Sequence, residues 1–269
     1  MSFSKILSGI IHVLSAVKTL PRIVRAKLFS GNQGIIDNSI NSFYRGHMPL
    51  AESQGVEAIE TIRKSMLQSD AKIPRIEFGK GSNTLSNTTV TERISDVCRV
   101  MSKPKRECLF LFYLLKTLKP IQCLELGTCL GISSAYIGMA IRQNGQGRLV
   151  TFEGSPARAK IAEININDLG LAKNVKVIEG RFQNKVGEHL KEIGYIDFAF
   201  IDGHHQQDAT IGYFNQLLPK FLNGGIMVFD DVFWSSGMNR AWKKIKKSDP
   251  VIDSFVFKGM GIIEVGISA

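Results

Sequence analysis

Short apolar runs and amphipathic segments alternate regularly along the second half of the chain. The apolar runs have the length of buried strands, and the segments between them place apolar residues at helical spacing. The runs lie at 121–126, 148–153, 174–179, 195–201 and 225–230, and the helical segments at 132–143, 156–168, 184–193 and 207–221. This alternation predicts an α/β domain whose parallel sheet is buried on both faces.

Two further apolar runs end the chain, after a basic helical segment at 237–247. They cover 252–258 and 260–266, and Gly259 separates them. Such close spacing predicts an antiparallel hairpin, because a parallel crossover needs a much longer connection. The predicted fold class is therefore α/β, with a Rossmann-like, mostly parallel sheet, a C-terminal antiparallel hairpin and additional N-terminal helices.

The first 119 residues follow a different pattern. Helical spacing of apolar residues recurs at 3–19, 53–67, 90–101 and 104–118, whereas 71–89 is rich in the residues typical of loops. We therefore predict two parts: an N-terminal helical and loop region, 1–119, that acts as a lid or an interface, and a domain at 120–269.

Net charge and cysteine content limit the expected binding partners and the expected cellular compartment. The net charge is +10, which favours contact with anions such as nucleic acid, a membrane surface or acidic small molecules, without choosing among them. The four cysteines form no C-x-x-C pair, which favours buried thiols in a reducing compartment over disulfides or zinc. We expect a cytoplasmic protein, and we expect it to form a homo-oligomer.

Residues 1–30 carry basic side chains and no acidic ones. Their apolar stretch at 6–17 is too short to span a bilayer, and no small-residue cleavage site follows it. A basic amphipathic helix could instead rest on a membrane surface, which would make the protein peripheral to the membrane. The alternatives are a helix packed on the domain and a mobile tail.

The first strand of the domain leads into a glycine-containing turn and a helix, "CLELGTCLGISSAYIGMAI". Gly127 and Gly131 do not form the G-x-G-x-x-G pattern that brings a pyrophosphate to a helix N-terminus. S-adenosylmethionine has no phosphate, and it needs a backbone that approaches its amino-acid part, which Gly127 permits. Glu125 would orient the loop or the amine of the ligand.

Two later strand ends fit the adenosine part of such a ligand. Glu153 ends the second strand, where an acid can accept both ribose hydroxyls, although dinucleotide sites use an acid in the same way. Gly180, Arg181 and Phe182 follow the third strand and would flank an adenine. Phe182 could stack on the adenine or belong to the core, and Glu153 could be a solvated loop acid.

Three aspartates end the fourth and fifth strands. Asp202, Asp230 and Asp231 should converge beside the glycine loop, because ligands bind beyond the carboxyl ends of parallel strands. Carboxylates gathered in this way repel one another unless a cation or a proton is present, and oxygen ligands suit Mg²⁺. The alternative is that Asp202 contacts the cofactor, Asp230 caps a helix and Asp231 faces water.

A histidine on the same loop is the candidate base. A neutral His204 near the pocket could take the proton from a substrate hydroxyl, so His204 and Asp202 are the predicted catalytic residues. We expect His205 to point elsewhere if the loop is extended. Trp234 follows the acidic pair and either forms a wall of the acceptor pocket or is a packing residue.

Together these motifs resemble the class I S-adenosylmethionine-dependent methyltransferases, in the O-methyltransferase-like branch (methyltransferase family 24-like). The motifs "CLELGTCLGISSAYIGMAI", "VTFEGSP", "VIEGRFQN", "FAFIDGHH" and "GGIMVFDD" occur in the family's order over about 120–266. The resemblance implies a methionine-side loop, a ribose acid, an adenine loop and a set of metal carboxylates. The methionine-side loop comprises Glu125, Gly127, Thr128, Gly131 and Ser133, and the ribose acid is Glu153. The adenine loop comprises Gly180, Arg181 and Phe182. The metal carboxylates are those of Asp202, Asp230 and Asp231.

The last pair departs from part of the family. Catechol-type enzymes often carry Asp-Asn there, whereas this chain has Asp230 and Asp231, as in some sugar O-methyltransferases. The resemblance therefore implies S-adenosylmethionine as cofactor and leaves Mg²⁺ open.

We expect methylation of a hydroxyl oxygen on a small molecule, with catalysis mainly by positioning. A nucleic-acid methyltransferase is the first alternative; the net charge favours it, but the chain has no N-P-P-Y or Pro-Cys motif. A non-catalytic binding module is the second, and the intact Gly127, Glu153 and Asp202 argue against it.

Overall fold

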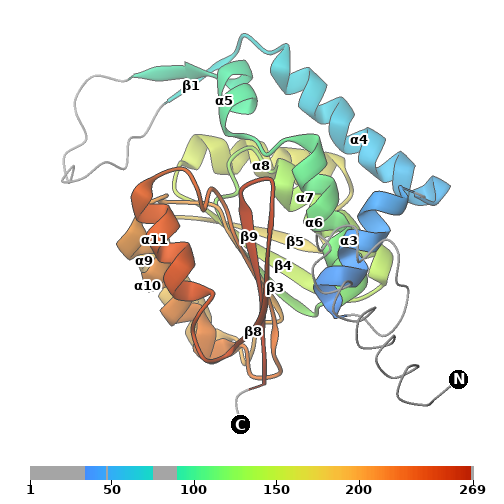
Figure 1. Cartoon of the computed structure of the whole chain (residues 1–269). Coiled ribbons are helices and arrows are strands. Elements are labelled where there is room, and N and C mark those ends of the chain that lie inside the picture. Colours follow the sequence, from blue (N-terminus) through green and yellow to red (C-terminus); the bar gives the residue numbers. More distant parts are fainter. Residues whose placement is uncertain (1–33, 47, 75–89, 268–269) are drawn as a thin grey trace, which may run out of the picture.

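The computed structural model describes residues 34–46, 48–74 and 90–267. Helices α3 to α6 precede the main sheet, and the other helices alternate with its strands (Figure 1). The helices are α3 (Ile35–Arg45), α4 (Leu50–Leu67), α5 (Ile94–Met101), α6 (Lys105–Leu118), α7 (Ile132–Asn144), α8 (Pro156–Asp168), α9 (Phe182–Glu192), α10 (Gln207–Leu217) and α11 (Ser236–Ile245).

The main sheet has seven strands in the order β5-β4-β3-β6-β7-β9-β8. Its strands are β3 (Gln122–Leu126), β4 (Arg148–Glu153), β5 (Val175–Glu179), β6 (Phe198–Ile201), β7 (Gly225–Phe229), β8 (Val251–Phe257) and β9 (Met260–Val265). Strands β3 to β7 are parallel, while β9 is antiparallel to both β7 and β8. The predicted mostly parallel sheet with a C-terminal antiparallel hairpin is confirmed.

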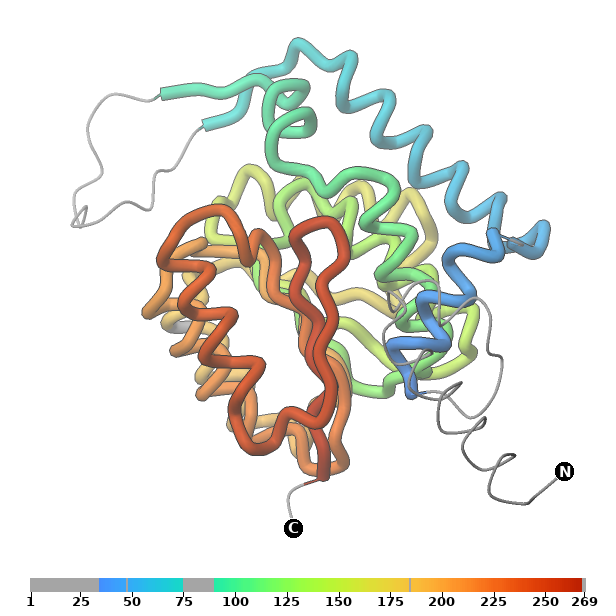
Figure 2. The backbone as a smooth tube through the Cα atoms, in the orientation of Figure 1, coloured from blue at the N-terminus to red at the C-terminus, as the bar shows by residue number. Residues whose placement is uncertain are grey.

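Helices cover both faces of this sheet (Figure 1). Side chains alternate along each strand, so Cys123 and Phe198 enter the core shared with α6 and α7, whereas Leu124 and Ala199 enter the core shared with α9 to α11. Because both faces are buried, the strands are apolar throughout, which explains the continuous apolar runs in the sequence. The C-terminal hairpin lies beside β7 at one edge (Figure 2).

The N-terminal helices join the first of these cores. Ile36 and Ile40 of α3 and Ile59 of α4 are fully buried in the same apolar cluster as the sheet residues Phe198 and Phe200. In the described part of the chain, no helix is both long enough and apolar enough to cross a membrane.

Most predicted elements are present, with differences before residue 94. The segment 90–101 contains the short strand β2 (Thr91–Arg93) before α5, because 91–93 pair with β1 (Lys72–Pro74). Helix α3 was missed in the sequence, although Ile36 and Ile40 place apolar side chains on one of its faces. The predicted helix at 3–19 and the proposed membrane contact of residues 1–30 lie outside the described residues.

Candidate functional site

The strand ends that were expected to carry the site lie in one row. Leu126 pairs with Phe152 on one side and with Ile201 on the other, and Ile201 pairs with Phe229. All four strands run in the same direction, so the residues that come directly after these four paired positions meet at one edge of the sheet. Those residues are Gly127, Glu153, Asp202 and Asp230.

A pocket of about 980 Å³ opens above this edge. Its walls include the loops after the strands, the connection between α5 and α6, and residues of α7 and α8. Ten of the predicted site residues line it: Gly127, Thr128, Ser133, Glu153, Arg181, Phe182, Asp202, His204, Asp230 and Asp231. Glu125, Gly131 and Gly180 do not line it.

The glycine loop passes very close to the end of β6. Gly127 has φ 108°, and a Cβ atom there would lie 2.0 Å from the carbonyl oxygen of Asp202. Gly131 has φ 84° and is the N-cap residue of α7, where a Cβ would lie 3.1 Å from Ala162. The first glycine therefore permits contact with the acidic edge, while the second permits contact between helices.

Glu125 supports the loop from behind. Its carboxylate accepts hydrogen bonds from the hydroxyls of Ser134 and Thr151, and the Thr151 hydroxyl lies 2.6 Å from that of Thr128. Burial raises the pKa of Glu125, and the hydroxyl hydrogen bonds oppose this shift. Glu125 is fully buried and outside the pocket, so of its two predicted roles the contacts match orientation of the loop.

Glu153 faces the pocket between two loops. Its two carboxylate oxygens accept hydrogen bonds from the backbone N–H groups of Ser155 at 2.9 Å and Cys129 at 2.8 Å. Burial raises its pKa, while these backbone donors and Arg158 oppose the shift. Each carboxylate oxygen keeps a further lone pair, which can accept a hydrogen bond from a hydroxyl group of a ligand.

His204 packs into an aromatic group instead of facing the acids. Its Nδ1 lies 2.7 Å from the hydroxyl of Tyr213, and its ring lies edge-on to Phe182 with the centroids 5.5 Å apart. Burial lowers the pKa of His204. Phe182 packs tightly under Gly203 and also lines the pocket, so it has both a packing contact and a side that faces the cavity.

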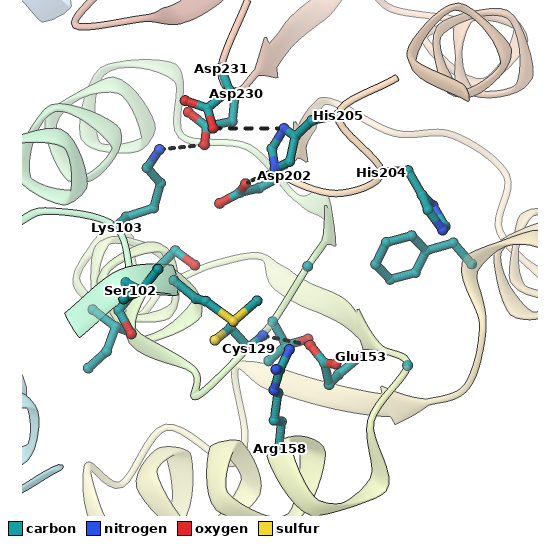
Figure 3. Close-up of a pocket in the computed structure, with 18 of the residues that line it drawn as sticks. Ser102, Lys103, Cys129, Glu153, Arg158, Asp202, His204, His205, Asp230 and Asp231 are labelled. Carbon is teal, nitrogen blue, oxygen red and sulfur yellow. Dashed lines mark hydrogen bonds and ion pairs between the residues drawn. The ribbon is translucent and has the colours of Figure 1, made fainter. Parts of the chain in front are cut away.

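A lysine enters the acidic cluster. The Lys103 ammonium donates to the carboxylate of Asp230 (Figure 3). It also lies 3.3 Å from a carboxylate oxygen of Glu107. Burial and the neighbouring Asp230 raise the pKa of the Asp202 carboxyl well above its usual range, and Lys103 opposes this shift. Burial would lower the pKa of Lys103, but Asp202 and Asp230 outweigh this effect and raise the pKa above its usual value.

His205 approaches the cluster from the other side (Figure 3). Its Nε2 lies 3.6 Å from a carboxylate oxygen of Asp202, and its Nδ1 lies 3.9 Å from one of Asp231. We expected His205 to point away; the turn at His204, which has φ 55°, directs it inward. The imidazole beside the acids is therefore that of His205.

Sequence reasoning missed Lys103, Glu107 and Arg158, which also line the pocket. Lys103 and Glu107 belong to "SKPKRE" between two helices, and Arg158 lies in α8, where its guanidinium contacts Glu92 at 2.7 Å. Nothing in these segments distinguishes them from solvated charges. The packing of α5 and α6 over the sheet edge brings Lys103 and Glu107 to the site, and α8, which follows β4, brings Arg158.

Comparisons with known proteins agree with this geometry. Residues 124–232, which contain the glycine loop and all three aspartates, match the family model described as a methyltransferase domain. This segment is a methyltransferase domain. The match, together with relatives named O-methyltransferases, confirms the predicted family, its O-methyltransferase-like branch and the enzyme class.

Named relatives of this methyltransferase include two curated enzymes. A flavonoid 3',5'-methyltransferase of Vitis vinifera is 24% identical over 72% of this chain and 80% of its own length. A catechol O-methyltransferase of Niastella koreensis is 32% identical, over 46% of this chain and 54% of its own length. Among solved structures, an O-methyltransferase from Bacillus cereus in complex with SAH has a TM-score of 0.57 at 19% identity, over 87% of this chain and 100% of that one. That likeness confirms the fold of the methyltransferase.

The three aspartates of the methyltransferase do not form a vacant metal site. The ammonium of Lys103 occupies the space beside Asp230, and Asp231 has a left-handed backbone with a 41% exposed side chain directed to His205. Within the described ranges, no group of three or more histidine, cysteine, aspartate or glutamate side chains is arranged to hold a metal ion. The predicted Mg²⁺ ligand set therefore does not fit this arrangement.

Proposed function

We propose that this pocket binds S-adenosylmethionine and that the enzyme methylates a hydroxyl oxygen of a small molecule. The observation that carries the proposal is the placement of Glu153, Gly127 and Asp202 side by side along one sheet edge, facing one pocket. A volume of about 980 Å³ lies at the upper end of the range for small-molecule sites, which suits a cofactor together with an acceptor.

The residues around the pocket fit the parts of this cofactor. Glu153 offers two acceptor oxygens to the ribose hydroxyls, and Arg181 and Phe182 lie next to it for the adenine. The loop at Gly127 and Thr128, with Ser133 at the start of α7, offers polar backbone and side-chain atoms to the methionine part. Gly180 and Gly131 contribute only through the backbone turns that they permit.

S-adenosylmethionine, when bound, supplies an electrophilic methyl group: the C–O bond forms as the C–S bond breaks, and the electron pair remains on sulfur. The protein must place the acceptor oxygen in line and receive its proton. We assign the proton to His205 rather than to the predicted His204, since Asp202 and Asp231 lie next to His205 and stabilise the charge that it gains. His204 positions the loop through Tyr213.

The mouth of the pocket suits an acceptor with an apolar part. Val100, Met101 and Trp234 line it and are 80%, 46% and 74% exposed, respectively. Exposed apolar side chains at the rim of a polar site favour a ring or chain that carries the hydroxyl. The relatives' names refer to flavonoids and catechols, which have this character, and none refers to nucleic acid.

Calorimetry with S-adenosylmethionine and NAD⁺ in parallel tests the cofactor. We expect binding of S-adenosylmethionine that weakens at least about tenfold in Glu153→Ala, because two ribose hydrogen bonds are lost. Glu163→Ala on the exposed face of α8 is the matched control and should bind like the wild type. Binding of NAD⁺ without any response to S-adenosylmethionine would refute the proposal.

A methyl-transfer screen over catechols, flavonoids and aliphatic alcohols identifies the acceptor class. With an accepted substrate, Trp234→Ala should raise the KM for the acceptor while leaving S-adenosylmethionine affinity within about twofold. A change in cofactor affinity alone would show that the rim does not contact the acceptor.

A further inference from the structure

We propose that the Lys103 ammonium replaces a divalent cation in this active site, so that methyl transfer proceeds without a metal ion. The inference rests on the proposed function for its catalytic part. It is based on the side-chain contacts of the acidic cluster, in which the Lys103 ammonium supplies the positive charge.

The lysine is held in place at both ends. Its carbonyl oxygen accepts hydrogen bonds from the guanidinium of Arg63 at 2.8 Å and from the thiol of Cys108 at 3.5 Å. Its side chain is only 11% exposed, and its ammonium contacts Asp230 and Glu107. An exposed lysine would sample many rotamers, whereas this one is fixed by a buried backbone and two carboxylates.

The contacts of Lys103 conflict with a bound metal ion. Mg²⁺ requires oxygen ligands at about 2.0–2.1 Å in near-octahedral geometry. A cation placed between Asp202 and Asp230 would meet the ammonium at the same carboxylate, and the two positive charges would repel each other. Asp231, the third expected ligand, is directed to His205 instead.

The same ammonium can stabilise the acceptor oxygen in the way that a bound metal ion would. An ammonium has three N–H donors, and the two carboxylates account for two of them. Lys103 lines the pocket together with Asp202, Asp230 and His205, so the third donor can reach an acceptor oxygen. A hydrogen bond from this charge stabilises the oxygen as its proton moves to His205 and its lone pair forms the bond to the methyl carbon.

Titration of the full-length protein with Mn²⁺, followed by calorimetry, tests the site without any turnover. We expect no stoichiometric binding to the wild type or to Lys103→Arg, which keeps the positive charge. Lys103→Met should gain one Mn²⁺ site, and a second substitution, Asp230→Asn, should remove it. Lys105→Met, an exposed lysine two residues away, is the control and should behave like the wild type.

Turnover gives an independent readout. Wild-type activity with an accepted hydroxyl substrate should survive EDTA, and Lys103→Met should lose about 100-fold in turnover. One Mn²⁺ bound by the wild type and removed by Asp230→Asn, or activity lost in EDTA and restored by Mg²⁺, would overturn the proposal. If Lys103→Met fails to fold, the two wild-type measurements still decide.

The two proposals fail in different ways. Absence of S-adenosylmethionine binding would refute the function, while the Mn²⁺ titration would still show whether Lys103 excludes a metal. Mn²⁺ binding by the wild type together with normal S-adenosylmethionine binding would refute only the role of Lys103.

Discussion

Gly127 illustrates how one residue can determine the shape of the whole site. The loop that follows β3 contacts the end of β6 so closely that even a Cβ atom would lie 2.0 Å from the carbonyl oxygen of Asp202. The left-handed φ of 108° adds a second reason for glycine. This close approach brings the backbone of the loop next to the acidic cluster.

Gly127→Ala should therefore destabilise the protein by more than about 2 kcal/mol and weaken S-adenosylmethionine binding at least about tenfold. Gly145→Ala is the matched control, because Gly145 also has a positive φ, 74°, but a Cβ there would meet no atom within 4 Å. Urea unfolding and calorimetry on both variants separate backbone strain from the steric contact. Equal effects of the two substitutions would show that the contact with Asp202 is unimportant.

Glu125 predicts a pH dependence of stability. Its pKa is raised in the folded protein by burial, so the folded state binds this proton more tightly than the unfolded state. The stability that this proton contributes is fully present below the pKa of the unfolded chain, about 4.3. It is lost as pH rises from there through the raised pKa of the folded protein, because the buried carboxyl then ionises.

Glu125→Gln removes this titration. The free energy of unfolding of the variant, relative to the wild type, should improve as pH rises from about 4 through the raised pKa, and then level off. Urea unfolding at a series of pH values measures the difference. A relative stability that does not change with pH would contradict the assignment.

At the scale of elements, helix α4 positions the residue that completes the acidic cluster. Arg63 contacts Glu60 of the same helix at 3.0 Å and donates to the carbonyl of Lys103 between α5 and α6. Tyr136 of α7 donates to the same Glu60 at 2.8 Å. A helix far from the pocket is thereby linked, by a chain of hydrogen bonds, to the ammonium beside Asp230.

Arg63→Met should cost about 1–3 kcal/mol of stability, because the buried Lys103 carbonyl and Glu60 each lose a partner. It should also lower turnover more than it weakens S-adenosylmethionine binding, since Lys103 is displaced while the glycine loop is untouched. Lys64→Met, on the exposed face of α4, should change neither quantity. Turnover, calorimetry and urea unfolding distinguish these outcomes.

At the scale of the molecule, the N-terminal helices form part of the main core. Leu111 and Phe112 of α6 are fully buried, and they belong to the same cluster as Ile36 of α3 and Phe200 of β6. The division at residue 119 suggested by the sequence thus separates two patterns of elements, and we propose that these two parts unfold together.

One cooperative unfolding transition is therefore expected. Both tryptophans, Trp234 and Trp242, lie after residue 119, whereas circular dichroism also reports on α3 to α6. Fluorescence and far-ultraviolet circular dichroism should give the same urea midpoint. A second transition, visible only by circular dichroism, would show that the N-terminal helices are a separate unit.

The sequence by itself determined the sheet and the location of the site. Apolar runs and helical spacing are local properties, and parallel strands place Gly127, Glu153, Asp202 and Asp230 at one edge whatever the details of packing. Gly127 could also be recognised from sequence, because a glycine in a tight strand–helix turn is a conformational requirement.

Only the tertiary structure decided what surrounds the acids. Lys103 is about 100 residues before Asp202 in the chain, and its charge alone is indistinguishable from that of a solvated lysine. The choice between His204 and His205 depended on one left-handed residue and on the position of Tyr213. Side-chain directions and long-range contacts arise from tertiary packing, and a local sequence pattern does not contain this information. The ammonium of Lys103 in the acidic cluster could therefore be identified only from the folded structure.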